Sequence, residues 1–540
     1  MKRVLAVLLA CTATVAVAQD RAEPSFTAAG VRAHIEFLAD DMLEGRDAGT
    51  RGYDIAARYV ATRFEAMGLK PGGTDGWYQR VPFVRTQLKA GAPATIAING
   101  KTFVNGVDVL MNSSAKYPDQ VVDAEVVFVG WGIDSPANGF DDYKGLDVRG
   151  KVVAYLQGVP QGGNSEINAH LASERGKMAG DHGAIGTVAI LTPALEKRMS
   201  WDRIRAYGSA PALRWIDKNG EPYSPAPKMT IGGGMGPVAR EALFAGAKRP
   251  LATILAEAEK PGVRPKGFAL PAKLRFERHS QLEKLTSPNV LAVLPGSDPA
   301  LANEYVLLMA HLDHDGINEK AEGADKIMNG AMDNAAGTAT MLEVARAFAE
   351  SGVRPKRSIL FAAVTAEEDG LLGSEYLAKN PVIGAGKVVG VVNLDMPILT
   401  YDFTDVTAFG AEHSTMGPMV AAAVAKAGVK LSPDPMPEEG LFTRSDHYMF
   451  VVEGVPSVML ATGFAGEGEA KTRDFLKNNY HQVSDQPTLP FNWEAGAKFA
   501  RINYLIARDL ADAPQAPRWY EGNFFGTVFA KDAPKAPKSR

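Results

Sequence analysis

Three short apolar runs constrain the fold of this chain more than any other feature of its sequence. They span residues 305–310, 358–364 and 388–394, and each is nearly continuous in apolar side chains. Runs of this length suit strands that are buried on both faces of a sheet. Between the first two runs, residues 335–350 are rich in alanine and repeat apolar residues at helical spacing. The order of strand, helix and strand predicts an α/β fold, in which a mixed, mostly parallel sheet is sandwiched by helices.

Acidic and imidazole side chains follow these runs. His311 comes directly after the first run, and Asp395 comes directly after the third. Glu367 and Glu368 follow the second run within a few residues. Ligands of parallel sheets gather at the carboxyl ends of the strands, so we expect these side chains to lie close together.

A divalent metal ion is the ligand that this set of side chains favours. Imidazole and carboxylate groups without a thiolate indicate zinc first, and manganese or cobalt second. A site for two ions that share one carboxylate needs five side chains. Asp333 is the expected bridge, because the positive end of the predicted helix keeps its carboxylate ionised. We therefore predict two zinc ions per chain, held by His311, Asp333, Glu368, Asp395 and His481.

Two further acids are predicted to act beside these ligands. Adjacent residues of an extended chain point to opposite sides, so Glu367 and Glu368 should not bind the same ion in the same way. We expect Glu367 to be the general base, which takes a proton from the attacking water and passes it to the leaving group. Asp313 lies two positions after His311, and its carboxylate is expected to accept the second imidazole N–H.

Six stretches of the sequence resemble, in order and in spacing, the zinc-dependent aminopeptidases and carboxypeptidases of family M28. They read AHLDHDG, NGAMDNAAGTA, TAEEDGLLGSEY, NLDM, RSDHYMFVVEGVPSV and YHQVSD. The resemblance implies that Glu367 is the base and that Asp313 stands behind the ligands. It implies two ligand sets, namely His311, Asp333 and Asp395 for one zinc, and Asp333, Glu368 and His481 for the other.

Other polar residues in these stretches lie outside the implied ligand sets. Asp315 departs from the family pattern, because many relatives carry an apolar residue after the second histidine, and it bears only on the rim of the site. Arg444 suits a contact with a substrate carbonyl or carboxylate, and equally a structural salt bridge. Three histidines are expected behind the ligands or beside the substrate: His314, His413 and His447. Four are expected to be structural or surface residues: His34, His170, His182 and His279.

The length of 540 residues predicts two or three domains. Residues 26–113 and 272–512 are assigned to the peptidase domain. Between them, residues 114–271 alternate strand-like runs with turns, and the stretches VVFVGWGIDSPANGFDDYKGLDVRGKVVAYLQG and HGAIGTVAIL resemble the protease-associated (PA) domain. Such a β-rich insertion would cover the cleft, and a spacer without function is the alternative. Residues 513–540 form a tail whose last residues are expected to be mobile.

The N-terminus has the pattern of an export signal. A basic start, a short apolar core and the sequence AVA at residues 16–18 predict a cleaved signal peptide over residues 1–18. We therefore expect a periplasmic or secreted protein, with lipid anchoring at Cys11 as the alternative. No other apolar stretch approaches the ~20 residues of a membrane span. The net charge of -4 does not indicate the basic surface that binds nucleic acid, so we expect no nucleic-acid partner.

The resemblance and the predicted site together lead us to expect a zinc-dependent exopeptidase that acts on peptides. We expect an aminopeptidase, which removes N-terminal residues by means of metal-activated water. The nearest alternative is a carboxypeptidase of the glutamate carboxypeptidase type. A receptor-like binding protein would need none of the ligands, and a glutaminyl-cyclase-like transferase would typically use one zinc and fewer of them.

Overall fold

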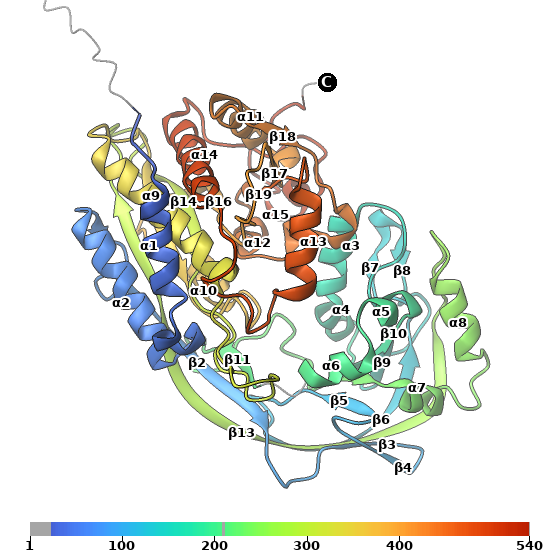
Figure 1. Ribbon diagram of the computed structural model, residues 1–540. Helices are drawn as coiled ribbons and strands as arrows, with labels where there is room; N and C mark the ends of the chain where they lie inside the picture. The colour runs from blue at the N-terminus through green and yellow to red at the C-terminus, as the bar shows by residue number, and fades with distance from the viewer. Residues whose placement is uncertain (1–22, 208–210, 539–540) are drawn as a thin grey trace, which may run out of the picture.

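The computed structural model of the chain describes residues 23–207 and 211–538. The predicted signal peptide and Cys11 lie outside the described residues. Two bodies lie side by side, and the long strand β13 (Phe268–Leu294) runs beneath both of them (Figure 1). Within the described ranges, none of the helices combines the length and the apolar character that a membrane span requires.

The first body is built on a mixed sheet whose centre is parallel. Strand β14 pairs in parallel with β15 on one side and with β16 on the other, and β16 pairs in parallel with β19. Antiparallel strands complete the sheet at both sides, where β13 pairs with β15 and with β2, and β17 pairs with β19. The strands are β2 (Tyr78–Leu88), β14 (Glu304–His311), β15 (Ser358–Val364), β16 (Lys387–Asn393), β17 (Asp405–Phe409), β18 (Lys430–Ser432) and β19 (Ser457–Thr462). This sheet confirms the predicted fold class.

Helices cover both faces of this sheet, which explains why its central strands are apolar throughout. Successive residues of a strand point to opposite faces. Leu308 and Phe361 therefore join the core under one helical layer, whereas Leu307 and Leu360 join the core under the other. The first layer contains α1 (Ala28–Leu38), α2 (Arg51–Ala66), α9 (Ala336–Glu350), α11 (Met416–Lys426) and α14 (Trp493–Asp512), and the second contains α10 (Leu372–Lys379) and α12 (His447–Val452).

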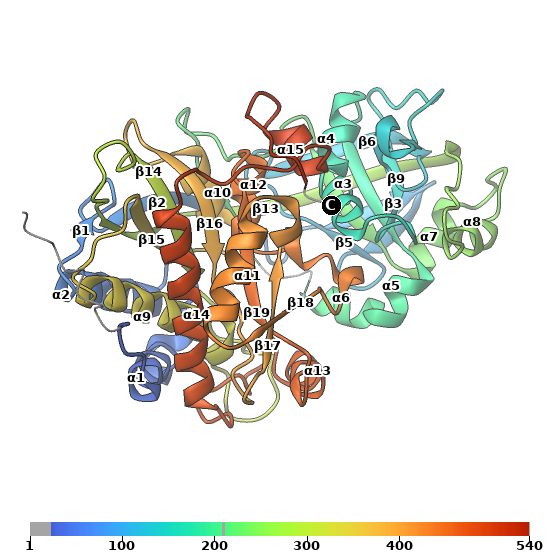
Figure 2. The same cartoon turned by 90° about the horizontal axis from the view of Figure 1, so that it is seen from above.

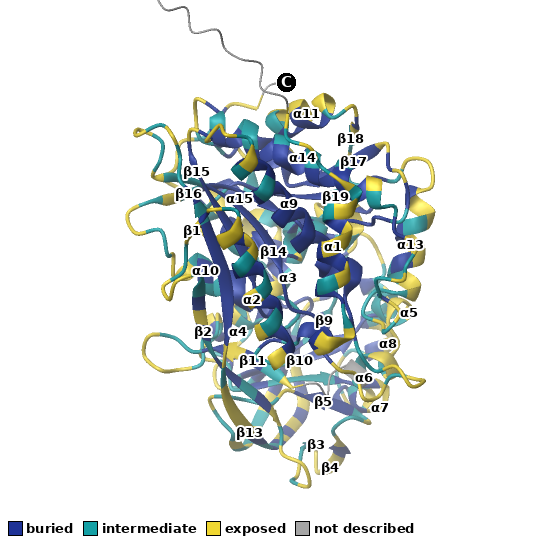
Figure 3. Cartoon of the chain, turned by 60° about the vertical axis from the view of Figure 1, so that its left-hand side comes forward, coloured by how far each residue is buried: buried dark blue, intermediate teal, exposed yellow. Residues whose placement is uncertain are grey.

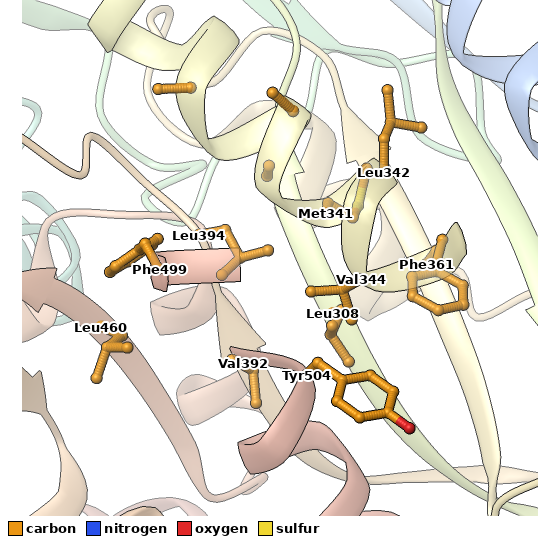
Figure 4. Packing of buried hydrophobic residues seen from close by; sticks show 14 of the residues in the cluster. Leu308, Met341, Leu342, Val344, Phe361, Val392, Leu394, Leu460, Phe499 and Tyr504 are labelled. Carbon is orange, nitrogen blue, oxygen red and sulfur yellow. The ribbon is translucent and has the colours of Figure 1, made fainter. Parts of the chain in front are cut away.

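Close packing in the first layer joins α9 and α14 to the sheet. Met341 and Val344 of α9, Tyr504 of α14 and Leu308 of β14 belong to one buried cluster (Figure 4). Buried residues run along the central strands and α9, and exposed residues lie on the outward faces of helices such as α1 and α11 (Figure 3).

The second body is built on its own sheet, which shares β13 with the first. The first part of β13 pairs with β3 and β6, and its later part pairs with β2 and β15. Strands β6, β9, β10 and β12 are joined by parallel pairs, and β5 pairs antiparallel with β12. These strands are β3 (Thr95–Ile98), β4 (Lys101–Val104), β5 (Val109–Met111), β6 (Asp119–Phe128), β9 (Val152–Gln157), β10 (Gly186–Leu191) and β12 (Ile231–Met235). Figure 2 shows this body beyond the end of the first sheet.

The boundaries of the second body differ from those expected from the sequence. Strands β3, β4 and β5 precede residue 114, yet β3 and β5 pair within the second sheet and β4 pairs with β3. The expected boundary between residues 271 and 272 falls inside β13. Both differences arise because the strand partners are distant in the sequence: Thr95 pairs with Glu277.

The C-terminal segment packs onto the first body rather than extending from it. The backbone of Ala536 donates a hydrogen bond to the carbonyl of Trp519 (2.8 Å) and accepts one from Glu521 (2.9 Å). The helix α15 (Phe524–Phe529) places Phe525 in a buried aromatic cluster with Phe442 and Tyr448. Ala536, which lies among the last residues that were expected to be mobile, is thus hydrogen-bonded to Trp519 and Glu521.

We expect Leu308→Ala to lower the free energy of unfolding by about 2–5 kcal/mol, because the truncated side chain leaves a cavity in a closely packed core. Leu308 is 0 % exposed. The matched control is Val353→Ala, because Val353 is 49 % exposed and a surface truncation changes stability by about 0.5 kcal/mol or less. Denaturant titrations of both variants provide the measurement, and equal shifts would contradict the assignment of Leu308 to the core.

Candidate metal centre

The candidate ligands meet at the carboxyl edge of the parallel strands. His311 is the last residue of β14 and lies level with Val364, the last residue of β15. Glu367 and Glu368 follow β15 after a short turn, and Asp395 lies two residues beyond the end of β16. The segment Ala331–Ala335, which carries Asp333, leads directly into α9. His481 comes from the loop between α13 (Gly468–Asn478) and α14.

The Asp333 carboxylate lies between the two histidines. Its Oδ1 is 3.2 Å from Nε2 of His311, and its Oδ2 is 3.3 Å from Nε2 of His481. Asp395 Oδ1 lies 3.2 Å from the same nitrogen of His311, and Glu368 Oε2 lies 3.2 Å from the same nitrogen of His481. The five side chains thus form two trios that share Asp333: His311, Asp333 and Asp395, and Asp333, Glu368 and His481.

The donor set fits divalent ions. Four carboxyl groups lie together at a largely buried site: those of Asp333, Glu367, Glu368 and Asp395. A cluster of like charges away from water requires compensating positive charge. Imidazole and carboxylate donors without thiolate suit zinc. The residues present therefore fit the ions that the sequence predicts.

The surroundings separate the pKa values of the carboxyl groups. Burial raises the pKa of Asp333, but its hydrogen bonds to His311 and His481 outweigh burial and hold the value well below the usual range. Burial and Asp333 raise the pKa of Glu368, but His314 and His481 outweigh them and lower it to about 2. Burial raises the pKa of Glu367 well above its usual range, although His311 opposes the effect. Glu367 therefore retains a proton more readily than its neighbours do.

Asp313 lies behind the ligands, but not with the contact that the sequence suggested. The outer nitrogen of His311, Nδ1, lies 3.2 Å from the backbone carbonyl oxygen of Asp313 rather than from its carboxylate. The carboxylate instead accepts a hydrogen bond from the backbone N–H of Glu368 at 3.2 Å. Asp313 is 1 % exposed, and burial raises its pKa to about 6. Asp313 thus connects the loops that carry His311 and Glu368.

Several residues that sequence reasoning missed support the ligands. Asp485 accepts hydrogen bonds from the backbone N–H groups of Met332 (2.9 Å) and Asp333 (3.0 Å). Ser445 donates a hydrogen bond to Oδ2 of Asp395 at 2.5 Å. Both belong to the quoted stretches, YHQVSD and RSDHYMFVVEGVPSV, so their place in the motifs was the available signal.

Arg46 links the loops around the candidate metal centre by hydrogen bonds to their backbone carbonyls. It is 1 % exposed and donates hydrogen bonds to the carbonyls of Leu312 (2.9 Å), Asn329 (2.6 Å) and Gly330 (3.1 Å), as well as to that of Leu38. Burial lowers the pKa of Arg46 to about 10, and the nearby acids, led by Asp313, oppose the effect. No local pattern in the sequence singles out Arg46, because three of its four carbonyl partners lie more than 260 residues away.

The remaining singled-out residues fall into four groups. His314 and Asp315 touch ligands: Nδ1 of His314 lies 2.6 Å from Oε1 of Glu368, and Oδ2 of Asp315 lies 3.4 Å from Nδ1 of His481. His447 is buried beside Asn393. His413 was expected behind the ligands or beside the substrate, but its ring contacts Glu166 and Asn523 instead. The other histidines make structural contacts: His34, His170, His182 and His279.

An apolar pocket opens beside the ligand cluster. His311, Asp333, Glu367, Glu368 and Asp395 line one side of it. Its other walls are mainly apolar, and they include Met396, Ile398, Phe409, Met436, Leu441, Met459 and Phe464. Among the described residues that line the pocket, Arg444 is the one arginine or lysine.

The second body contacts the rim of this pocket. Arg198 forms an ion pair with Glu439 at 2.7 Å, and Glu439 also lies 3.4 Å from Arg444. The helix α3 (Ser165–Ser173) packs against the short helices Pro437–Glu439 and Leu441–Thr443. The pocket is therefore bordered by residues that the second body holds in place.

Comparisons with known proteins find a family model, curated relatives and solved structures to which this chain is similar. Residues 289–507, which include all five candidate ligands and Glu367, match the model of the family described as "Peptidase family M28". Mouse "Aminopeptidase NAALADL1" is 32% identical over 151 residues, which cover 26% of this chain and 18% of that protein. "Leupeptin-inactivating enzyme 1" of Streptomyces exfoliatus is 36% identical over 112 residues, covering 21% and 23%. "Probable glutamate carboxypeptidase AMP1" of Arabidopsis thaliana is 29% identical over 161 residues, covering 29% and 21%.

The alignments thus span about a fifth of the length of these curated relatives. Among solved structures, "Aminopeptidase from Aneurinibacillus sp. strain AM-1" superposes with a TM-score of 0.52 at 20% sequence identity. This superposition covers 91% of this chain and 95% of that one, and it supports the fold.

We expect Arg46→Leu to destabilise the chain by about 3–5 kcal/mol, because removing one member of a buried polar network leaves its partners without compensation. The same variant should bind zinc more weakly, because the loops that bear His311 and Asp333 lose their common anchor. Thermal unfolding and zinc titration measure the two effects. Arg58→Leu, at an exposed arginine of α2, is the control. Equal stability of the two variants would show that Arg46 does not fasten these loops.

Proposed function

We propose that this chain, whose residues 289–507 belong to peptidase family M28, is a zinc-dependent exopeptidase that removes N-terminal residues from peptides. The observation that carries the proposal is the pair of ligand trios that share Asp333 and border an apolar pocket. We further propose that each chain holds two zinc ions, one in each trio.

The chain's own groups would divide the work of peptide hydrolysis. Bound zinc would supply a Lewis acid for the substrate carbonyl and would acidify the attacking water. Glu367 would accept a proton from that water and deliver it to the nitrogen of the departing peptide. The apolar pocket would hold the side chain of the substrate's first residue and exclude water from the reacting bond.

The pocket offers few groups that could hold the carboxyl terminus of a substrate. Arg444, the one arginine or lysine among its described lining residues, is 51% exposed and lies beside Glu439. A grip on a terminal carboxylate would require basic groups that are not already compensated.

A carboxypeptidase of the glutamate carboxypeptidase type is the second candidate. Arg444 favours it, because its guanidinium lines the same pocket as the ligands. A receptor-like binding protein and a glutaminyl-cyclase-like transferase are less well supported, since neither needs five ligands together with Glu367.

The second body is proposed to be a PA-like domain that restricts the size of the substrate. The support is its contact with the pocket rim through Arg198 and α3. We also propose that residues 1–18 are a signal peptide and that the enzyme works in the periplasm or outside the cell, on the strength of the N-terminal sequence pattern.

We expect Glu367→Gln to bind zinc like the wild type yet lose about 10²–10⁴-fold in turnover, because a glutamine cannot carry the proton. Metal analysis and steady-state kinetics on a free peptide measure the two properties. Glu65→Gln, at an exposed position of α2, should leave both unchanged. Normal turnover in Glu367→Gln would assign proton transfer to another group.

Comparison of a free peptide with its N-acetylated form tests the direction of cleavage. We expect release of the first residue from the free peptide, no release from the blocked one, and loss of activity with a chelator that added zinc restores. Mass spectrometry of the products identifies the bond that is cut. Cleavage of the blocked peptide from its C-terminus would favour the carboxypeptidase, and the absence of any chelator-sensitive hydrolysis would favour the binding protein.

A further inference from the structure

We propose that Asp315 is a positioning residue, which fixes the imidazole of His481 and thereby strengthens ion binding on the His481 side of the centre. The inference rests on the proposed two-zinc function and extends it to a residue outside the expected ligand set. It concerns the position at which this chain departs from the family pattern.

The two nitrogens of His481 face different partners. Nε2 lies 3.3 Å from Asp333 and 3.2 Å from Glu368, so this nitrogen points into the ligand cluster. Nδ1, the outer nitrogen of the same ring, lies 3.4 Å from Oδ2 of Asp315. A carboxylate on the outer nitrogen of a ligating histidine orients the ring, fixes which nitrogen is free to bind, and raises the ligand's basicity.

His481 needs such support more than the other ligands do. Its side chain is 25% exposed, whereas those of His311 and Asp333 are 1% and 5% exposed. It comes from a loop rather than from a strand end, and its backbone lies in the left-handed region with φ of 54°. Tyr480 and His314 border the ring, with centroids 4.0 Å and 5.7 Å away. Neither of these ring contacts replaces a polar partner for Nδ1.

Asp315 is itself held on a fixed part of the chain. The backbone N–H of His314 bonds to the carbonyl of Arg46 (3.3 Å), and that of Gly316 bonds to the carbonyl of Gly45 (3.1 Å). The two neighbours of Asp315 are therefore tied to the segment that contains the buried Arg46. The contact from Asp315 to His481 therefore links the loop that carries His481 to this segment.

The outer ring nitrogens of His311 and His481 have different partners. The outer nitrogen of His311 meets a neutral backbone carbonyl, whereas that of His481 meets a carboxylate. Removing the charge of Asp315 should therefore weaken the binding of the ion on the His481 side and leave the binding of the other ion unchanged. A general loss of folding would weaken both.

The experiment compares wild type, Asp315→Asn, Asp315→Glu and the control Glu319→Gln, an exposed acid of the same loop. Each ion-free protein is titrated with zinc against a chromophoric chelator, and zinc per chain is measured by elemental analysis. We expect Asp315→Asn to bind one of its two ions about 10–100-fold less tightly, with the affinity for the other ion unchanged. Asp315→Glu should recover part of the loss, and Glu319→Gln should match the wild type.

The number of zinc ions that the wild type binds per chain distinguishes a failure of the inference from a failure of the proposed function. Wild type with two ions and Asp315→Asn with unchanged affinities would overturn the inference alone, whereas wild type with one ion would overturn the two-zinc function. Visible spectra of the cobalt-saturated proteins distinguish positioning from direct ligation. We expect the same band shape in wild type and Asp315→Asn, and a change of shape would show that Asp315 is itself a ligand, contrary to the proposal.

Discussion

Electrostatic balance at Asp333 is the constraint on which the rest of the site depends. Its two oxygens face His311 and His481, and the remaining ligands are grouped around those two contacts. The carboxylate sits among other acids and has little access to water, so it is stable there only with positive charge on both sides. Asp485 fixes its place by binding the backbone N–H groups of Met332 and Asp333. The fold thus brings a concentrated negative charge to one edge of a parallel sheet and holds it rigidly.

The meeting of the candidate ligands at one edge of the sheet could be predicted because their positions follow from local patterns. An apolar run of about seven residues shows where a buried strand ends, and parallel strands end at a common edge. His311, Glu368 and Asp395 follow such runs, so their convergence required no knowledge of tertiary contacts. The strand expected over residues 358–364 is β15 as found, and the helix expected over residues 335–350 begins one residue later.

The features that escaped prediction depend on partners distant in the sequence. Arg46 donates to a carbonyl 266 residues away, and nothing near Arg46 reveals that contact. The assignment of β3 to the second sheet rests on its pairing with β13. The contact between Asp315 and His481 likewise joins two loops that only the folded chain brings together. Sequence patterns locate strand ends, but they do not show which distant groups meet there.

Anomalous X-ray diffraction from crystals grown with zinc tests the central claim most directly, through difference maps recorded on either side of the zinc absorption edge. The account predicts two peaks, one within bonding distance of His311, Asp333 and Asp395, and the other within bonding distance of Asp333, Glu368 and His481. A single peak, or a pair of peaks that excludes Asp333, would contradict it.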